Sequence, residues 1–186
     1  PAAIDYIIHN KLNEFFPGRY RQLGIIVQGG LYNLIIRALQ RQGLADVYGV
    51  SDIPIYVMNV AYPLVPDEIL EFSQGKQQLL IIEEGQPDYI EQGIQTVLRR
   101  AEQNLRVYGK DIMPMAGEYT GQVMLEGLTR FIEAADLPTA QRDAVLLVVA
   151  AGMTYEEAKR APMGLQFLNI GHHQPVTTEQ WFKRKQ

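Results

Sequence analysis

A pair of glycines, Gly29 and Gly30, stands where a short apolar run, Leu23 to Val27, gives way to a helical pattern that begins near Leu31 and Tyr32. A helix that starts directly after a strand presents free N–H groups and a partial positive charge, which suits an anion or a phosphate-bearing cofactor. Two glycines also form an ordinary tight turn between strand and helix. We favour the turn, and we retain Gly29, Gly30 and Tyr32 as candidate ligand or inter-domain contacts.

Side chains able to do acid–base chemistry follow the next two predicted strands. Glu83 and Glu84 end the most apolar strand, and Tyr62 precedes Pro63 after the strand before it. Adjacent strand residues point to opposite faces, so the two carboxylates are not expected to enter one pocket together. One of them is a candidate functional carboxylate, although a structural role for both is favoured. Tyr62 is either a loop anchor, which we favour, or a hydroxyl that faces a cleft.

Several kinds of catalytic site are excluded by the residues themselves. The two serines, Ser51 and Ser73, do not occupy a Gly-x-Ser-x-Gly turn, and the sequence contains neither a Walker loop nor Gly-x-Gly-x-x-Gly. The chain has no cysteine, so it offers no thiolate for nucleophilic catalysis, zinc or iron–sulfur clusters. The histidines, His9, His172 and His173, are too few and too badly spaced for a catalytic metal site, and no metal ligand is predicted.

The elements that position these residues alternate between strands and helices. Three consecutive strand-then-helix units predict a parallel sheet with right-handed crossovers and helices on both faces. We therefore expect a three-layer α/β/α domain with a mainly parallel sheet of four or five strands, plus a helical C-terminal appendage. The expected parts are an N-terminal helix and linker over 1–19, with helical periodicity from Ile4 to Phe15, the α/β domain over 20–137, and the appendage over 138–186. Leu105 to Tyr108 is predicted as an additional edge strand.

Composition and charge restrict the classes of partner and the cellular location that we expect for the chain. Its 186 residues are 47% apolar and 20% charged, with a formal net charge of −4, as in ordinary folded domains. Basic residues are dispersed, which argues against a nucleic-acid surface. The longest apolar run, Ala144 to Ala151, is far shorter than the roughly 18–20 residues of a membrane span, and the first residues given do not show the charged-then-apolar pattern of a leader. These observations predict a cytoplasmic chain without a membrane or nucleic-acid partner.

Four sequence pieces, taken in order, resemble a known family. They are GIIVQGGLYN, AYPLVPDEILEF, LLIIEEGQPDYIEQ and MPMAGEYT, which fall between about Ala2 and Ile132. Each piece alone is a weak signal, whereas their order and spacing together are fairly specific. The chain resembles the indolepyruvate ferredoxin oxidoreductases, which belong to the thiamine-diphosphate-dependent 2-oxoacid oxidoreductases. The last piece adds Glu118 to the candidate contacts.

The resemblance implies a transketolase C-terminal-like domain that packs between the cofactor-binding domains of a larger enzyme. The family holds thiamine diphosphate, Mg²⁺ and iron–sulfur clusters through motifs that this chain lacks, so we expect no cofactor and no catalytic residue here. The expected partners are other domains or subunits of the oxidoreductase, with ferredoxin reached only through the parent enzyme. Alternatives are a freestanding small-ligand or anion-binding module, and a subunit-assembly domain that forms a homo-oligomer or docks a partner subunit.

Overall fold

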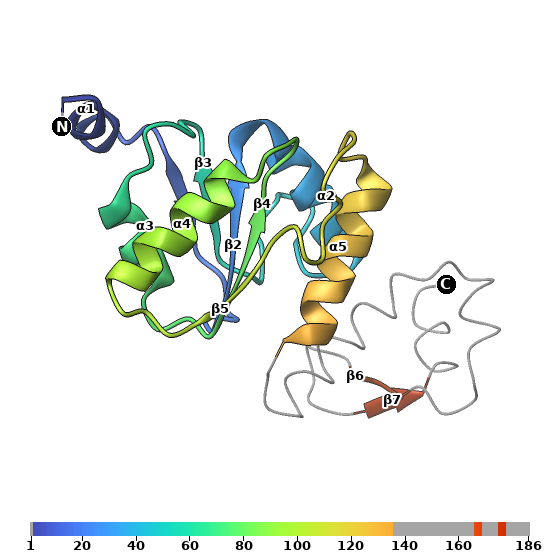
Figure 1. The fold of residues 1–186 in the computed structure, drawn as a ribbon. Helices are drawn as coiled ribbons and strands as arrows, with labels where there is room; N and C mark the ends of the chain where they lie inside the picture. The colour runs from blue at the N-terminus through green and yellow to red at the C-terminus, as the bar shows by residue number, and fades with distance from the viewer. Residues whose placement is uncertain (1, 136–165, 169–174, 178–186) are drawn as a thin grey trace.

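The computed structural model describes residues 2–135, 166–168 and 175–177, and a five-stranded sheet forms its centre (Figure 1). In spatial order the strands are β1 (Glu14–Phe16), β3 (Ile55–Met58), β2 (Leu23–Gln28), β4 (Gln78–Ile82) and β5 (Arg106–Tyr108). β1 pairs antiparallel with β3, and all other neighbouring strands run parallel. The mainly parallel sheet and the edge strand that ends at Tyr108 are thereby confirmed.

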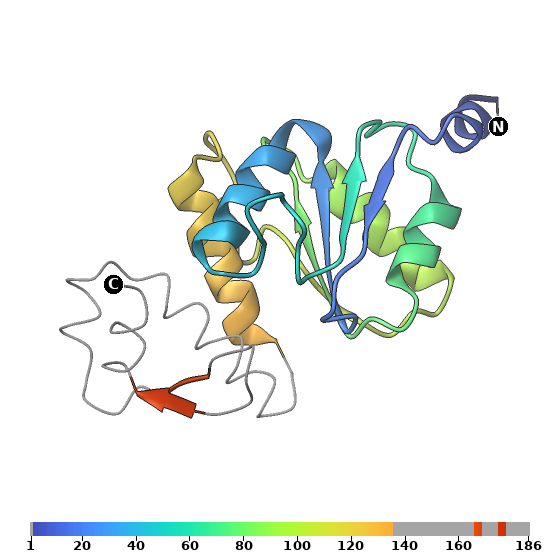
Figure 2. The ribbon, with the colours of Figure 1, turned by 180° about the vertical axis from the view of Figure 1, so that it is seen from behind.

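Helices cover both faces of this sheet, as Figures 1 and 2 show. A short 3₁₀ helix, η1 (Gly29–Leu31), leads into α2 (Tyr32–Arg41), which packs with α5 (Gly121–Ala134) on one face. The other face is covered by α3 (Pro66–Ser73) and α4 (Tyr89–Arg100). Parallel strands need a crossover between them, and the helices supply those crossovers. The predicted three-layer α/β/α architecture is confirmed.

The central strand β2 explains why its sequence is a continuous apolar run. Its first five residues are buried, because helices lie on both sides of the sheet. Ile25 and Val27 point into the core shared with α2 and α5, whereas Ile26 points into the core shared with α3 and α4. The period-2 alternation of a strand thus divides one apolar run between two separate cores.

The prediction of helical structure from Ile4 to Phe15 is wrong beyond the first two turns. α1 spans Ala2–His9, and Lys11 then adopts a positive φ of 49°. Glu14–Phe16 instead forms β1, in which the Phe15 ring stacks on Tyr56 at 4.7 Å between ring centroids. Helical spacing of apolar residues does not reveal a pairing with a strand some forty residues away, and that tertiary contact decides the local structure.

The connections make β2 the point at which the order of the strands in the sheet reverses. The chain passes from β2 to β3 on one side and then crosses to β4 on the other side of β2. In open α/β sheets, ligands bind outside the carboxyl ends of the strands at such a switch point. A ligand site in this fold is therefore expected at the carboxyl ends of β2 and β4.

The C-terminal part of the chain is described only in short pieces. β6 (Gln166–Leu168) and β7 (Pro175–Thr177) form an antiparallel pair within the range predicted as a helical appendage. The apolar helix predicted from Ala140 to Ala151 and the His172-His173 pair lie outside the described residues. None of the helices in the described part of the chain has the length and apolar character needed to cross a membrane.

Candidate functional site

A side chain of the protein itself spans the gap between the carboxyl ends of β2 and β4. Gln28, the last residue of β2, accepts a hydrogen bond through Oε1 from the backbone N–H of Glu84 at 3.0 Å. The last paired residues of the two strands are Val27 and Ile82, so this bond extends their contact beyond the ladder. The crevice in which a doubly wound sheet commonly binds its ligand is thereby crossed by an internal contact.

The glycine pair after β2 has two different surroundings. A Cβ atom on Gly29 would collide with Oδ1 of Asn59, whereas nothing lies within 4 Å of the corresponding position on Gly30. A side chain at Gly29 would therefore require the Asn59 amide to move, whereas Gly30 borders open space. Neither Gln28 nor Leu31 caps the following η1 and α2 helices with its side chain. The choice between an ordinary turn and an anion contact at Gly29 and Gly30 stays a prediction.

Glu83 is a buried carboxylate that caps the N-terminus of α4. Its exposed fraction is 6%, and its oxygens accept hydrogen bonds from the N–H groups of Ile90, at 3.1 and 3.0 Å, and Glu91, at 3.1 Å. The residue at the N-cap position itself, Asp88, makes no capping hydrogen bond. The carboxylate that directly follows β4 thus takes the place of a local cap, and its negative charge faces the positive end of the helix dipole.

Glu84 turns toward the opposite side of the sheet. Its Oε1 accepts a hydrogen bond from the backbone N–H of Tyr119 at 2.5 Å, just before α5 begins. The two neighbouring carboxylates therefore diverge, as strand geometry predicts, and each fixes the chain near the start of a different helix. These contacts favour a structural role for both carboxylates.

Lys110 and Tyr119 close this edge of the sheet. The Lys110 ammonium donates to the carbonyl oxygen of Glu83 at 2.5 Å, to the Tyr119 hydroxyl at 2.8 Å and to the carbonyl oxygen of Pro114 at 3.4 Å. The Tyr119 hydroxyl donates to the same Pro114 carbonyl at 2.7 Å. All three ammonium protons have acceptors, so Lys110 fastens the segment that follows β5 to the end of β4.

Burial is the largest electrostatic influence on this network, and it favours the uncharged form of each member. Burial lowers the pKa of Lys110, while the carboxylates of Glu83 and Glu91 act in the opposite direction. Burial, reinforced by the charges of Glu84 and Glu83, raises the pKa of Tyr119 to about 12. Burial also raises the pKa of Glu91. At neutral pH the tyrosine is a neutral hydrogen-bond donor, which suits a fixed structural contact rather than proton transfer.

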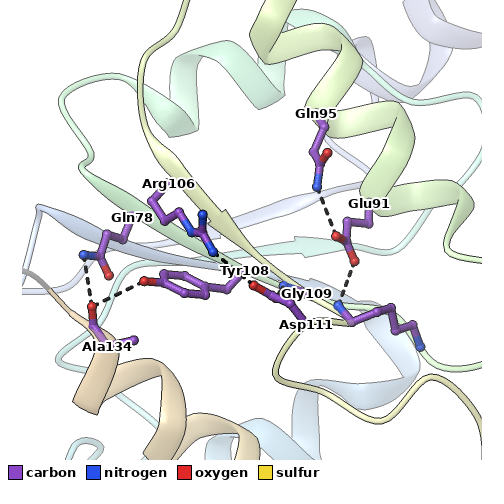
Figure 3. Close-up of polar contacts among 9 residues, drawn as sticks. Gln78, Glu91, Gln95, Arg106, Tyr108, Gly109, Asp111 and Ala134 are labelled. Carbon is purple, nitrogen blue, oxygen red and sulfur yellow. Dashed lines mark hydrogen bonds and ion pairs between the residues drawn. The ribbon is translucent and has the colours of Figure 1, made fainter.

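Beyond this edge, α4 and β5 are joined by polar contacts that Figure 3 shows. The Glu91 carboxylate accepts from the Lys110 N–H at 2.8 Å and from Gln95 at 3.0 Å. Asp111 accepts from the Gly109 N–H at 2.7 Å. An open groove of about 950 Å³ runs along the outer side of α4 and β5, and no residue predicted as a contact lines it.

The remaining predicted residues do not join the network around Glu83 and Glu84. Tyr32 lies at the start of α2, where its ring stacks on Phe16 at 5.2 Å between centroids. Tyr62 is 89% exposed in the segment after β3, and Glu118 is exposed in the segment before α5. Gln28, next to Gly29, accepts from the backbone of Glu84, and the N–H of Tyr32 donates to the carbonyl oxygen of Gly29. The side chains of Tyr62 and Glu118 are exposed to solvent.

Sequence reasoning overlooked Lys110 and Asn59 as members of this edge. Both follow the carboxyl end of a parallel strand, β5 for Lys110 and β3 for Asn59. The same rule that drew attention to Glu83 would have identified them, since carboxyl ends of parallel strands meet at one edge of the sheet.

The residues at this edge do not fit the Mg²⁺ and diphosphate of a thiamine cofactor. Such a site needs converging oxygen ligands around the metal, whereas Glu83 and Glu84 diverge and already accept backbone N–H groups. Within the described ranges, the structure contains no group of three or more His, Cys, Asp or Glu residues that could hold a metal. We therefore derive no chemical step through that cofactor for this chain.

The fold and this edge define a doubly wound α/β domain whose strand ends are occupied by contacts that anchor its own helices. No protein-family model matches the chain. It is similar to the indolepyruvate oxidoreductase subunit IorA of Methanothermobacter thermautotrophicus, with 26% identity over 137 residues, and to that of Methanothermobacter marburgensis, with 30% identity over 127 residues. These regions cover 72% and 62% of this chain, but only 20% and 19% of the relatives. The chain thus spans about a fifth of the length of either relative.

Proposed function

We propose that this chain is a non-catalytic domain of a larger 2-oxoacid oxidoreductase, with an aryl-pyruvate such as indolepyruvate as the substrate of the whole enzyme. Similarity to two IorA subunits supports the family, and the fraction of those subunits that is matched supports a domain rather than a whole enzyme. In this proposal, thiamine diphosphate, Mg²⁺, iron–sulfur clusters and the contact with ferredoxin belong to other domains or subunits.

The observation that carries the proposal is the use of Glu83 and Glu84. Both carboxylates stand where a doubly wound sheet would place functional groups, and both are committed to backbone N–H groups near the starts of α4 and α5. Lys110, the nearest cation, has three acceptors of its own. The charged groups at this edge form hydrogen bonds within the domain and so hold its helices and loops in place. A domain that packs between other domains of an enzyme needs such rigidity.

The proposal is tested by adding thiamine diphosphate with Mg²⁺ to the 186-residue chain and following its thermal unfolding. A ligand that binds the folded state at 100 times its dissociation constant adds about 2.7 kcal/mol of stability, which is easily measured. We expect no change in the unfolding temperature and no turnover of indolepyruvate with an artificial electron acceptor. Stabilisation by the cofactor, or turnover by the chain alone, would refute the assignment as a non-catalytic domain.

One observation favours a second function, the binding of a small anion near Gly30. Gly30 borders open space, and the helices that follow lack side-chain caps on their first N–H groups. Inorganic phosphate is the simplest probe. Stabilisation by phosphate that disappears in the Gly30→Ala variant would support this second function, and an equal response of both proteins would exclude it.

A further inference from the structure

The edge strand β5 has backbone hydrogen-bonding groups that point away from the sheet. Among the described strands, β5 is the last of the sheet and pairs with β4 alone. The N–H of Arg106 donates to the carbonyl oxygen of Gln77 at 2.8 Å, so the backbone groups of Arg106 face β4. Because successive residues of a strand direct these groups to alternate sides, the N–H and C=O groups of Val107 face outward. An open edge of this kind is a template for pairing with another strand.

The open groove of about 950 Å³ lies directly beside this edge. Leu105, Arg106 and Val107 line one side of it, and the outer side of α4 lines the other. The Tyr108 side chain extends away from α4, since its hydroxyl donates to the carbonyl oxygen of Ala134 at 3.4 Å (Figure 3). The groove therefore continues the α4 side of the sheet past its last strand.

Opposite charges lie at the two ends of this groove. Its charged lining residues are Glu91, Arg99, Glu102, Arg106 and Asp111. Glu91 in the first turn of α4 accepts from the N–H of Lys110, and Asp111 follows in the same segment after β5, so both carboxylates lie at the carboxyl end of β5. Arg99 in the last turn of α4 and Arg106 at the start of β5 lie at the other end. Glu102 is the one acidic lining residue at this basic end.

The neighbouring charges leave this polarity in place. Lys110 directs its ammonium to the carbonyl oxygens of Glu83 and Pro114 and to the Tyr119 hydroxyl, and it does not line the groove. Arg106 reaches Asp111 within the same chain at 3.4 Å, but the two side chains are 64% and 45% exposed. An exposed ion pair contributes little to stability, so both side chains are free to contact another molecule.

We infer that the β5 edge and the groove beside it form a two-fold symmetric interface with a second copy of this chain. In an antiparallel pair of β5 strands, Val107 lies opposite Val107 of the second copy, and the two residues exchange both outward N–H···O bonds. Such pairing brings the carboxyl end of each strand beside the amino end of the other. Glu91 and Asp111 then lie on the side of the second copy's arginines.

The charge pattern favours a second copy over an unrelated partner. A surface that is acidic at one end and basic at the other is complementary to itself under two-fold rotation, which is the condition for an isologous dimer. A partner with charges of one sign would instead meet a like charge at one end of the groove. The inference does not rest on the proposed function, because it uses only the edge and the groove of this chain.

The test measures the mass of the 186-residue chain by sedimentation equilibrium, together with variants of the edge and the groove. Val107→Pro removes the outward N–H but no bond to β4, and edge strands tolerate proline at such a position. Arg99→Glu reverses a charge in the groove. Its matched control is Arg100→Glu, an equal change at an exposed neighbour in α4 that does not line the groove. Circular dichroism checks the folding of each variant.

Crosslinking locates the interface independently of these variants. The chain has no cysteine, so a single introduced cysteine gives one site for a bismaleimide reagent. Gln95→Cys places it on the α4 side of the groove, and Arg37→Cys places it on α2, which covers the other face of the sheet. Both positions are exposed.

We expect a dimer of twice 21.1 kDa, with a dissociation constant raised at least about tenfold by Val107→Pro and by Arg99→Glu but less than about twofold by Arg100→Glu. We also expect crosslinked dimers from Gln95→Cys and few from Arg37→Cys. A wild-type chain that stays monomeric up to about 1 mM would overturn the inference. A dimer that responds equally to Arg99→Glu and Arg100→Glu, or that crosslinks equally from both cysteines, would overturn the assignment to this edge. If Val107→Pro fails to fold, the two charge reversals and the two cysteines decide the question.

Discussion

Removal of the Glu83 carboxylate is the most direct perturbation of the edge that holds the domain together. In Glu83→Ala, the N–H groups of Ile90 and Glu91 lose an acceptor in a place where Glu83 itself is only 6% exposed. Loss of a helix cap costs about 1 kcal/mol, and unsatisfied buried donors add roughly 1–3 kcal/mol. We therefore expect the free energy of unfolding to fall by about 2–4 kcal/mol.

The Glu83→Gln variant separates charge from hydrogen bonding. An amide keeps one oxygen acceptor of similar shape, but it removes the negative charge that faces the N-terminus of α4. Favourable charge at a helix end contributes roughly 0.3–1 kcal/mol, and up to about 2 kcal/mol where it is partly buried. We expect Glu83→Gln to lose about 1–2 kcal/mol, less than Glu83→Ala, because part of the cap survives.

Urea unfolding followed by circular dichroism measures these losses, and amide hydrogen exchange locates them. Exchange at Ile90 and Glu91 should accelerate in both variants, more in Glu83→Ala. The matched control is Glu118→Gln, an exposed carboxylate for which we expect a change within about 0.5 kcal/mol. The capping role would be refuted by a Glu83→Ala protein that unfolds at the wild-type midpoint with unchanged exchange at Ile90 and Glu91.

Three further predictions concern the same edge. Gly29→Ala adds a Cβ atom that would collide with Asn59, so we expect the free energy of unfolding to fall by about 1–3 kcal/mol. Gly30→Ala should change it by less than about 0.5 kcal/mol, because no atom lies near that position. Similar effects of the two substitutions would contradict the packing argument. Lys110→Met should lose about 1–2 kcal/mol in urea unfolding, and no loss would mean that its hydrogen bonds add nothing to stability. The pKa of Tyr119 is raised from 10.0 to about 12, so its neutral hydroxyl stabilises the fold below pH 10 and that contribution disappears as the pH rises through 12. Tyr119→Phe should therefore show a smaller loss of stability between pH 10 and 12, and an unchanged alkaline loss would exclude Tyr119 as its source.

The three-layer architecture with a mainly parallel sheet could be predicted from the amino-acid sequence. Continuous apolar runs such as Leu23 to Val27 and Gln78 to Ile82 are long enough for strands and too apolar for one-sided burial, which requires helices on both faces. Proline at the first turn of α3 and the strand-then-helix repeats followed from local backbone chemistry. Such signals are local, and they could be read residue by residue.

The sequence also limited the candidate site without defining it. The period-2 geometry of a strand required Glu83 and Glu84 to diverge, and the carboxyl ends of parallel strands had to meet at one edge. Which backbone groups the two carboxylates would meet depended on where α4 and α5 begin in space. The cap from Glu83 to Ile90 connects residues seven positions apart, and the bond from Glu84 to Tyr119 connects residues thirty-five apart.

Only the tertiary structure decided the pairings between distant segments. Phe15 continues a helical spacing in the sequence, yet its ring stacks on Tyr56 and its backbone belongs to an edge strand. Antiparallel pairing with β3 provides hydrogen-bond partners for the backbone N–H and C=O groups of Glu14–Phe16, and a longer α1 helix would have excluded that pairing. Lys110 gives no local sign of the three acceptors that surround its ammonium. Hydrogen-bond partners and packed faces are set by the whole fold, whereas periodicity and turn chemistry are set by neighbouring residues.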